Sequence, residues 1–241
     1  MSPLRKTALA AGVLYILTFV SIPTLFLYGP VKGANYILGP GPDTNVIVGG
    51  MLEIIVALAG IGTAVALYPV LKRQNEGVAL GLVGSRTLEA ATIFAGVVFL
   101  LSVVSLRQAG VGAAGLVTAQ ALATMYNRTF LVGQSFMPVV DDLLLGFLLY
   151  QSRLVPRVLP LLAFIGAALL VASDIAVLFG LLGQTSGALA ALPIALFEFS
   201  LGVYLIVKGF RPSPILSSDL YSLWLWNPSP LERNSETLSH G

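Results

Sequence analysis

Residues 78–106, VALGLVGSRTLEAATIFAGVVFLLSVVSL, decide the fold: they form a long apolar segment that contains Arg86 and Glu89 near its start. A helix of this length, at about 1.5 Å per residue, crosses the roughly 30 Å hydrocarbon core of a bilayer. Its fifteen Leu, Ile, Val and Phe residues each favour insertion by about 0.3 to 0.6 kcal/mol, which offsets about 2.5 to 3.5 kcal/mol for each charge. A spacing of three residues also lets Arg86 and Glu89 pair across one helical turn. The segment is therefore predicted to be a transmembrane helix with an internal ion pair.

The composition of the whole chain also indicates a membrane protein. Of its 241 residues 56% are hydrophobic and 10% are charged, whereas about 25% of the residues of a soluble domain are charged. The thirteen Lys and Arg residues are spread between apolar runs, so no nucleic acid is expected as a partner. The chain has no cysteine, and its one histidine is His240, so the usual ligands of haem and zinc are missing and we expect no cofactor or metal.

Six apolar segments are long enough to span a membrane and predict an all-α bundle. They are residues 8–28, 46–70, 78–106, 129–150, 158–182 and 189–207. Asp43 or Thr44 is expected to cap the second helix. The first segment exceeds the apolar region of about 7 to 15 residues typical of a signal peptide and lacks an A-x-A cleavage site, so we expect it to be retained.

Two regions of the chain do not fit the pattern of simple spans. Residues 113–150 would form one helix far longer than a bilayer requires, so we expect YNRTF at 126–130 to interrupt it. Residues 113–126 are then predicted to be a short interfacial helix, and Pro138 a kink in the following span. Residues 213–241 are polar and rich in Pro and Ser, which predicts a disordered tail in which SLWLW at 222–226 is a candidate aromatic anchor.

Positively charged residues are unevenly distributed between the two sides of the predicted bundle. One side has three, namely Lys32, Arg107 and Arg128. The other has eight, namely Arg5, Lys6, Lys72, Arg73, Arg153, Arg157, Lys208 and Arg211. The positive-inside rule therefore places both termini in the cytoplasm. No clear internal repeat is present, and a three-plus-three inverted arrangement stays open.

Seven ionisable residues fall inside the predicted spans and are the candidate site residues: Glu53, Arg86, Glu89, Asp141, Asp142, Asp174 and Glu198. Small residues three or four positions from Glu53, Asp142 and Glu198 predict that these acids lie in seams between helices. Depth along the helices makes Arg86 and Asp142 candidate partners. Asp141 and Asp142 point about 100° apart, so at least one of them is expected to reach the cytoplasmic headgroups.

The charge balance within the spans separates the functional hypotheses. Six carboxyl groups share one fully embedded cation, Arg86. Because unpaired anions are costly in a low dielectric, most of these groups must be protonated, hydrated or bound to a cation. The leading hypothesis is a small transporter in which Arg86, Glu89, Glu53 and Glu198 handle protons or a cationic solute. The alternative is a membrane scaffold or assembly subunit that uses these acids as interhelical glue. A homo-oligomer or another membrane partner stays open.

Enzyme motifs are missing from the sequence. It contains no H-E-x-x-H, G-x-S-x-G or Walker loop, and GVGAAG at 110–115 follows a membrane helix and has no Lys, unlike a phosphate-binding loop. Paired acids could still act as acid and base on a lipid headgroup. A membrane enzyme acting on a lipid is therefore the third hypothesis, without an assigned catalytic residue.

Four segments resemble the domain of unknown function 4386 family of bacterial six-helix membrane proteins. They are RKTALAAGVLYILTFV at 5–20, SRTLEA at 85–90, SRLVPRVLPLLAFIGAALLVAS at 152–173 and PIALFEFSLGVYLIVKGF at 193–210. The resemblance covers most of residues 3–212 and implies a polytopic fold in a bacterial cytoplasmic membrane. It also places Arg86 and Glu89 in the family's Arg-x-x-Glu signature and Glu198 at the acid of its last helix. Asp141, Asp142 and Asp174 are not part of that pattern.

Overall fold

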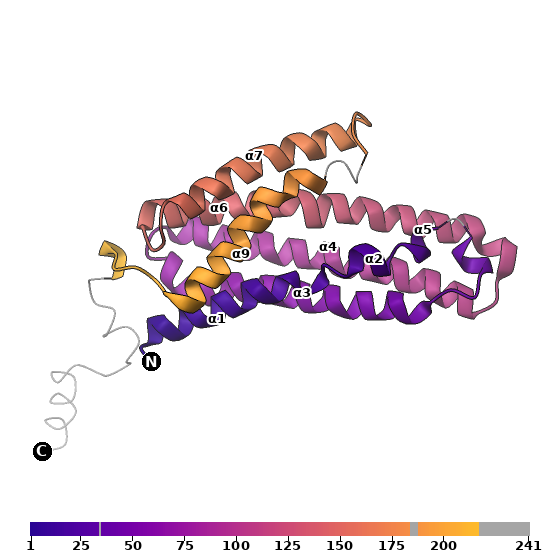
Figure 1. Cartoon of the computed structure of the whole chain (residues 1–241), viewed down its shortest axis with the longest axis horizontal. Coiled ribbons are helices and arrows are strands. Elements are labelled where there is room, and N and C mark those ends of the chain that lie inside the picture. Colours follow the sequence, from indigo (N-terminus) through magenta and orange to yellow (C-terminus); the bar gives the residue numbers. More distant parts are fainter. Residues whose placement is uncertain (34, 184–187, 217–241) are drawn as a thin grey trace, which may run out of the picture. The chain divides into compact units, whose positions relative to one another are not determined.

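The computed structural model describes residues 1–33, 35–183 and 188–216, and over these ranges the chain is helical and has no strand (Figure 1). Residues Met1–Arg211 form one compact unit, and the residues after it belong to a second unit. The tail at 217–241, with its candidate aromatic anchor, lies outside the described residues. Six helical segments of the first unit are long and apolar enough to cross a membrane. The chain is therefore a multi-pass integral membrane protein, as its composition predicts.

Over the described residues, the six spans consist mainly of ten helical elements in chain order. They are α1 (Pro3–Leu17), η1 (Thr18–Ser21) and α2 (Thr24–Leu27) in the first span; α3 (Asp43–Leu71); α4 (Glu76–Gln108); α5 (Leu116–Thr129), η5 (Phe130–Phe136) and α6 (Met137–Ser152) in the fourth; α7 (Val158–Leu178); and α9 (Leu192–Val207). Short 3₁₀ turns connect them, namely η2 (Pro30–Lys32), η3 (Tyr36–Leu38), η4 (Gly112–Gly115) and η6 (Ala188–Ala191). The fifth span ends four residues before the predicted position 182, where Gly180 adopts a positive φ of 72° that favours glycine.

The fourth span differs most from the prediction. The expected interruption at 126–130 is wrong, because helical structure runs from Leu116 to Ser152 through the π-helical segment η5. Pro138 follows directly after this segment. Proline has no N–H to donate to the preceding turn, and a wide π turn accommodates that loss without ending the helix. The interfacial location of residues 113–126 stays a prediction, and this segment packs along α4.

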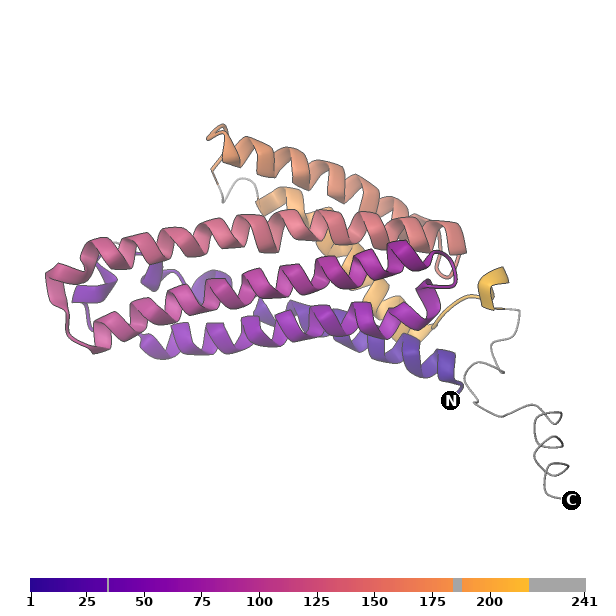
Figure 2. The ribbon, with the colours of Figure 1, turned by 180° about the vertical axis from the view of Figure 1, so that it is seen from behind.

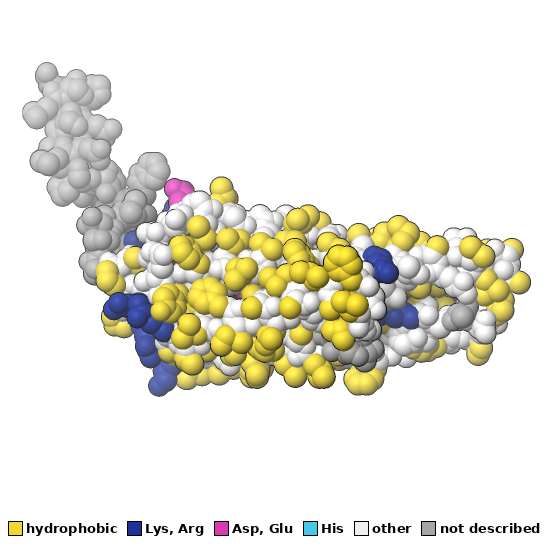
Figure 3. All heavy atoms as spheres, turned by 90° about the horizontal axis from the view of Figure 1, so that it is seen from above, with side chains coloured by type: hydrophobic (Ala, Val, Ile, Leu, Met, Phe, Trp, Pro, Cys, Tyr) yellow, Lys and Arg dark blue, Asp and Glu magenta, His cyan; other side chains and the backbone are white. Residues whose placement is uncertain are grey.

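The helices form a bundle in which α3, α4 and the continuous α5–α6 helix run side by side (Figures 1 and 2). Helix α1 packs against α3 and α9, and α7 packs against α6 and α9. Apolar side chains cover the face seen in Figure 3, and Lys and Arg side chains gather at the end where α1 begins. We call this the terminal end of the bundle, and the other the far end.

Arg5 joins the first and last helices at the terminal end. Its Nη1 donates to the carbonyl oxygen of Leu205 at 2.7 Å, and its Nη2 donates to the carbonyl oxygen of Ile206. These carbonyls belong to the last turn of α9, where a positive charge also interacts favourably with the helix dipole. Farther along the same contact, a Cβ atom on Gly12 would lie 2.7 Å from the carbonyl oxygen of Gly202. The seam predicted from the small residues on the face of Glu198 is confirmed at Gly202.

Asp43 and Arg107 hold α3 and α4 together at the far end. Arg107 Nε donates to Asp43 Oδ1 at 2.8 Å, and Arg107 Nη1 donates to the carbonyl oxygen of Gly39 at 2.8 Å. The prediction that Asp43 or Thr44 caps the second helix is wrong. Pro42 occupies the N-cap position without a side-chain hydrogen bond, and Asp43 lies in the first turn, where Arg107 binds it.

Candidate functional site

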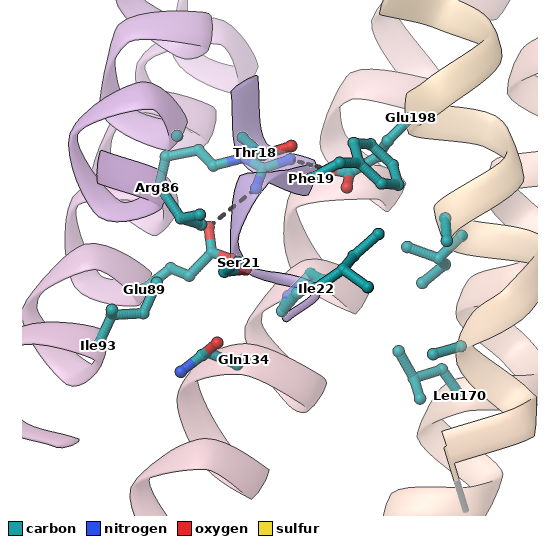
Figure 4. A pocket seen from close by; sticks show the side chains of 16 residues that line it. Thr18, Phe19, Ser21, Ile22, Arg86, Glu89, Ile93, Gln134, Leu170 and Glu198 are labelled. Atoms are coloured by element: carbon teal, nitrogen blue, oxygen red, sulfur yellow. Dashed lines mark hydrogen bonds and ion pairs between the residues drawn. The ribbon is translucent and has the colours of Figure 1, made fainter. Parts of the chain in front are cut away.

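Arg86 lies among acidic side chains from three helices in the middle of the bundle. Its Nη1 donates to Oε2 of Glu89 on α4 at 2.9 Å, and its Nη2 pairs with Oε1 of Glu198 on α9 (Figure 4). Its Nε lies 3.5 Å from Oδ2 of Asp141 on α6. Only 3% of Arg86 is exposed. One buried guanidinium thus joins α4, α6 and α9, and we call Arg86, Glu89, Asp141 and Glu198 the central cluster.

Two further helices shape the space around the central cluster. On α3, a Cβ atom added to Gly60 would lie 3.8 Å from Glu89 Oε2 and 4.0 Å from Arg86 Cδ, so this glycine lies directly beside the ion pair. On α1, the ring of Tyr15 lies 5.9 Å from Arg86 Cζ, within the range of a cation–π contact. The small residue and the aromatic ring explain how a charged pair fits inside an apolar bundle.

The adjacent acids Asp141 and Asp142 differ from the prediction in two ways. Arg86 pairs with Asp141 and not with Asp142, because successive helical residues diverge by about 100° and Asp141 is the one that faces α4. There Ser85 Oγ also donates to Asp141 Oδ1. Both acids are fully buried, so the expectation that at least one reaches the headgroups is wrong. Neither oxygen of Asp142 has a hydrogen-bond partner among the described residues.

A cavity of about 200 Å³ opens against the central cluster. Arg86, Glu89 and Glu198 line it together with Thr18, Ser21 and Gln134, among others (Figure 4). The side chains of Glu89 and Glu198 retain 11% and 14% exposure. This volume holds several water molecules, each of which takes up about 30 Å³ in the liquid. The cavity beside the central cluster is therefore large enough for a small hydrated ion.

Glu53 lies in a second polar centre, separate from Arg86. Its Oε1 accepts a hydrogen bond from the Tyr126 hydroxyl at 2.8 Å and one from Gln134 Nε2 at 3.4 Å. Lys32 adds its ammonium group 4.5 Å from the centre of the Tyr126 ring. Burial lowers the pKa of Lys32, and the nearby Glu53 carboxylate partly opposes this shift. The predicted grouping of Glu53 with Arg86, Glu89 and Glu198 around one centre is therefore wrong.

Sequence reasoning missed Tyr126, Gln134 and Lys32 as members of this centre. Gln134 could have been identified from the sequence, since it is a polar amide inside an apolar span. Lys32 follows the predicted first span and Tyr126 precedes the predicted fourth span, so only the fold brings these two residues to Glu53.

Asp174 occupies a third position in the bundle. It is 3% exposed, and its Oδ1 accepts a hydrogen bond from Ser135 Oγ in η5 at 2.7 Å. This contact links α7 to the fourth span and lies apart from the central cluster. Within the part of the chain that the structure describes, no three acidic or histidine side chains are arranged to hold a metal ion.

One of the comparisons with known proteins identifies a family. A family model described as a domain of unknown function, DUF4386, matches residues 10–209. No curated protein and no solved structure matches the chain. The matched range includes Arg86, Glu89, Asp141 and Glu198, so the central cluster lies within the matched region.

Replacing Arg86 tests the cohesion of the central cluster. Arg86→Gln leaves three buried acids without their shared cation, and we expect the free energy of unfolding to fall by about 3 to 5 kcal/mol, as when one partner of a buried ion pair is removed. Thermal unfolding in detergent measures the loss. Arg128→Gln, at an exposed position, is the matched control and should unfold like the wild type. Equal stability of the two variants would show that the cluster does not hold the helices together.

Proposed function

The chain belongs to the DUF4386 family, and we propose that it is a small transporter that carries hydrogen ions or a small cationic solute across a bacterial cytoplasmic membrane. The observation that carries the proposal is the cavity against Glu89 and Glu198, whose carboxyl groups share the cation Arg86. Intramembrane acids that face a cavity are typical of ion and proton pathways. An acid that merely joins two helices needs no such space beside it.

The geometry supports a coupling between binding and helix contacts. Glu198 bridges α9 to Arg86 on α4, and its side chain also faces the cavity. A hydrogen ion that binds Glu198, or a cation that enters beside it, competes with Arg86 for the same carboxylate. Occupancy of the cavity would therefore weaken the link between α4 and α9, which gives the bound ion a means of shifting these two helices.

Transport across the membrane also requires a defined orientation, and we propose that both termini face the cytoplasm. The eight basic residues counted above lie on the side where the chain begins. The bond from Arg5 to the last turn of α9 supports this arrangement, because it holds both ends of the unit together. The positive-inside rule then assigns that side to the cytoplasm.

Single cysteines test the orientation, because the chain contains none. Ala113→Cys at the far end is expected to react with a membrane-impermeant maleimide in intact cells. Ser2→Cys at the terminal end is expected to react only after permeabilisation. The wild type serves as the blank, and the reverse labelling pattern would contradict the orientation.

Ion flux into liposomes tests transport. With an imposed pH gradient, the reconstituted wild type should carry hydrogen ions, or a cation that dissipates the gradient. Glu89→Gln and Glu198→Gln should each slow this flux by at least about tenfold, since each removes a site for the positive charge. Glu76→Gln, at the exposed start of α4, is the matched control and should keep the wild-type rate. Flux that is the same in all four proteins would contradict the proposed centre.

One observation favours a second candidate function, a membrane scaffold. Arg86 joins α4, α6 and α9 by contacts that would hold these helices together even in a protein that transports nothing. In that case Glu89→Gln and Glu198→Gln lower the melting temperature, and neither the variants nor the wild type carries ions. Measuring melting temperature and flux on the same preparations separates the two functions.

A further inference from the structure

The second polar centre adjoins the central cavity. Gln134 lines that cavity together with Glu89 (Figure 4), and its Nε2 also lies 3.4 Å from Glu53 Oε1. Glu53 is therefore one hydrogen bond away from a residue that faces the central cavity. Its Oε1 also accepts the hydroxyl of Tyr126, which approaches from α5.

A second cavity lies at the far end of the bundle, on the other side of Tyr126. It has a volume of about 310 Å³, and its lining includes Lys32, Tyr36, Gln120, Thr124 and Asn127. The ammonium group of Lys32 lies over the Tyr126 ring, 4.5 Å from its centre. Lys32 thus connects this far cavity to Tyr126, and Tyr126 connects it to Glu53.

Glu53 has the properties of a site for a positive charge. It is 1% exposed, and its second oxygen, Oε2, makes no well-formed hydrogen bond to any described residue. The polar and titratable groups that face it are Tyr28, Lys32, Tyr126 and Gln134. A buried carboxylate oxygen that lacks a well-formed hydrogen bond is unfavourable, and a bound hydrogen ion lowers that cost by making the group neutral.

We propose that Glu53 is an intermediate station on a hydrogen-ion route from the far cavity to the central cavity. The inference rests on the proposed function and names the path by which ions reach the central cluster from the far side. One hydrogen ion from the far cavity binds Glu53 Oε2, and one leaves Glu53 towards the cavity that Glu89 and Glu198 line. The protein returns to its starting state, with one hydrogen ion moved.

The neighbours of Glu53 have separate roles in this route. Tyr126 and Gln134 both donate to Oε1 and hold the carboxyl group in place, so they are positioning residues. Lys32 lines the far cavity and lies over the Tyr126 ring, so its amino group marks the entrance of the route.

Flux measurements on three variants test the route. Glu53→Gln should slow hydrogen-ion flux by about 100-fold, the low end of what a positioned proton-transfer group contributes. Tyr126→Phe keeps the ring under Lys32 and removes one hydrogen bond to Glu53, so it should slow flux by about threefold to tenfold. Tyr68→Phe is the matched control, because Tyr68 is not among the residues that line either cavity and its hydroxyl bonds to Glu76 instead. It should keep the wild-type rate.

The outcomes separate this route from the proposed function. If Glu198→Gln stops the flux while Glu53→Gln and Tyr126→Phe carry ions at the wild-type rate, the route is wrong and the transporter stands. A wild type that carries a cation but no hydrogen ions would overturn the route alone, and a wild type that carries neither would overturn both. If Glu53→Gln does not fold, Tyr126→Phe decides alone, since the ring and its packing are kept.

Discussion

The burial of Arg86 is the constraint on which the bundle depends. A guanidinium group keeps its charge at any physiological pH, so it cannot enter an apolar bundle without acids close by. Glu89 meets this need within α4, and Asp141 and Glu198 bring in α6 and α9. Because each of these acids must point at the same group, the arginine fixes how three helices are rotated about their axes. Gly60 on α3 lies beside the same ion pair.

The same arginine sets the electrostatic character of the interior. One positive charge balances one of its three acidic neighbours, and Asp142 adds a buried acid that has no hydrogen-bond partner among the described residues. The remaining negative charge has to be neutralised from outside the protein, and hydrogen ions are the smallest species that can do so. A cavity lies beside Glu89 and Glu198, and Glu53 forms a second polar centre. The proposed transport rests on this combination.

Much of the architecture could be predicted because it follows from local properties of the chain. Hydropathy alone locates the six spans, since each must match the thickness of a bilayer. The pairing of Arg86 with Glu89 follows from their spacing on one helix, and the burial of Asp174 follows from its place inside an apolar segment. The family resemblance pointed to Glu198, which the structure places against Arg86.

The remaining features depend on contacts between distant parts of the chain. The choice of Asp141 over Asp142 depends on the rotation of α6, which packing against α4 and α7 sets. The partners of Glu53 come from segments before α3 and from the fourth span, so no spacing along the sequence identifies them. The predicted break at 126–130 is wrong, because the polar residues there lie inside a helix and do not end it. In the fold, α5 continues through them along α4.

Infrared spectroscopy of the protein in lipid bilayers at neutral pH tests the central claim most directly, because a protonated carboxyl group and a carboxylate absorb at different frequencies. Asp142 is fully buried and has no hydrogen-bond partner in the described part of the chain, so a band of protonated carboxyl groups is expected in the wild type, and it should weaken in Asp142→Asn. A spectrum that contains carboxylate bands alone, unchanged by that substitution, would contradict an interior neutralised by hydrogen ions.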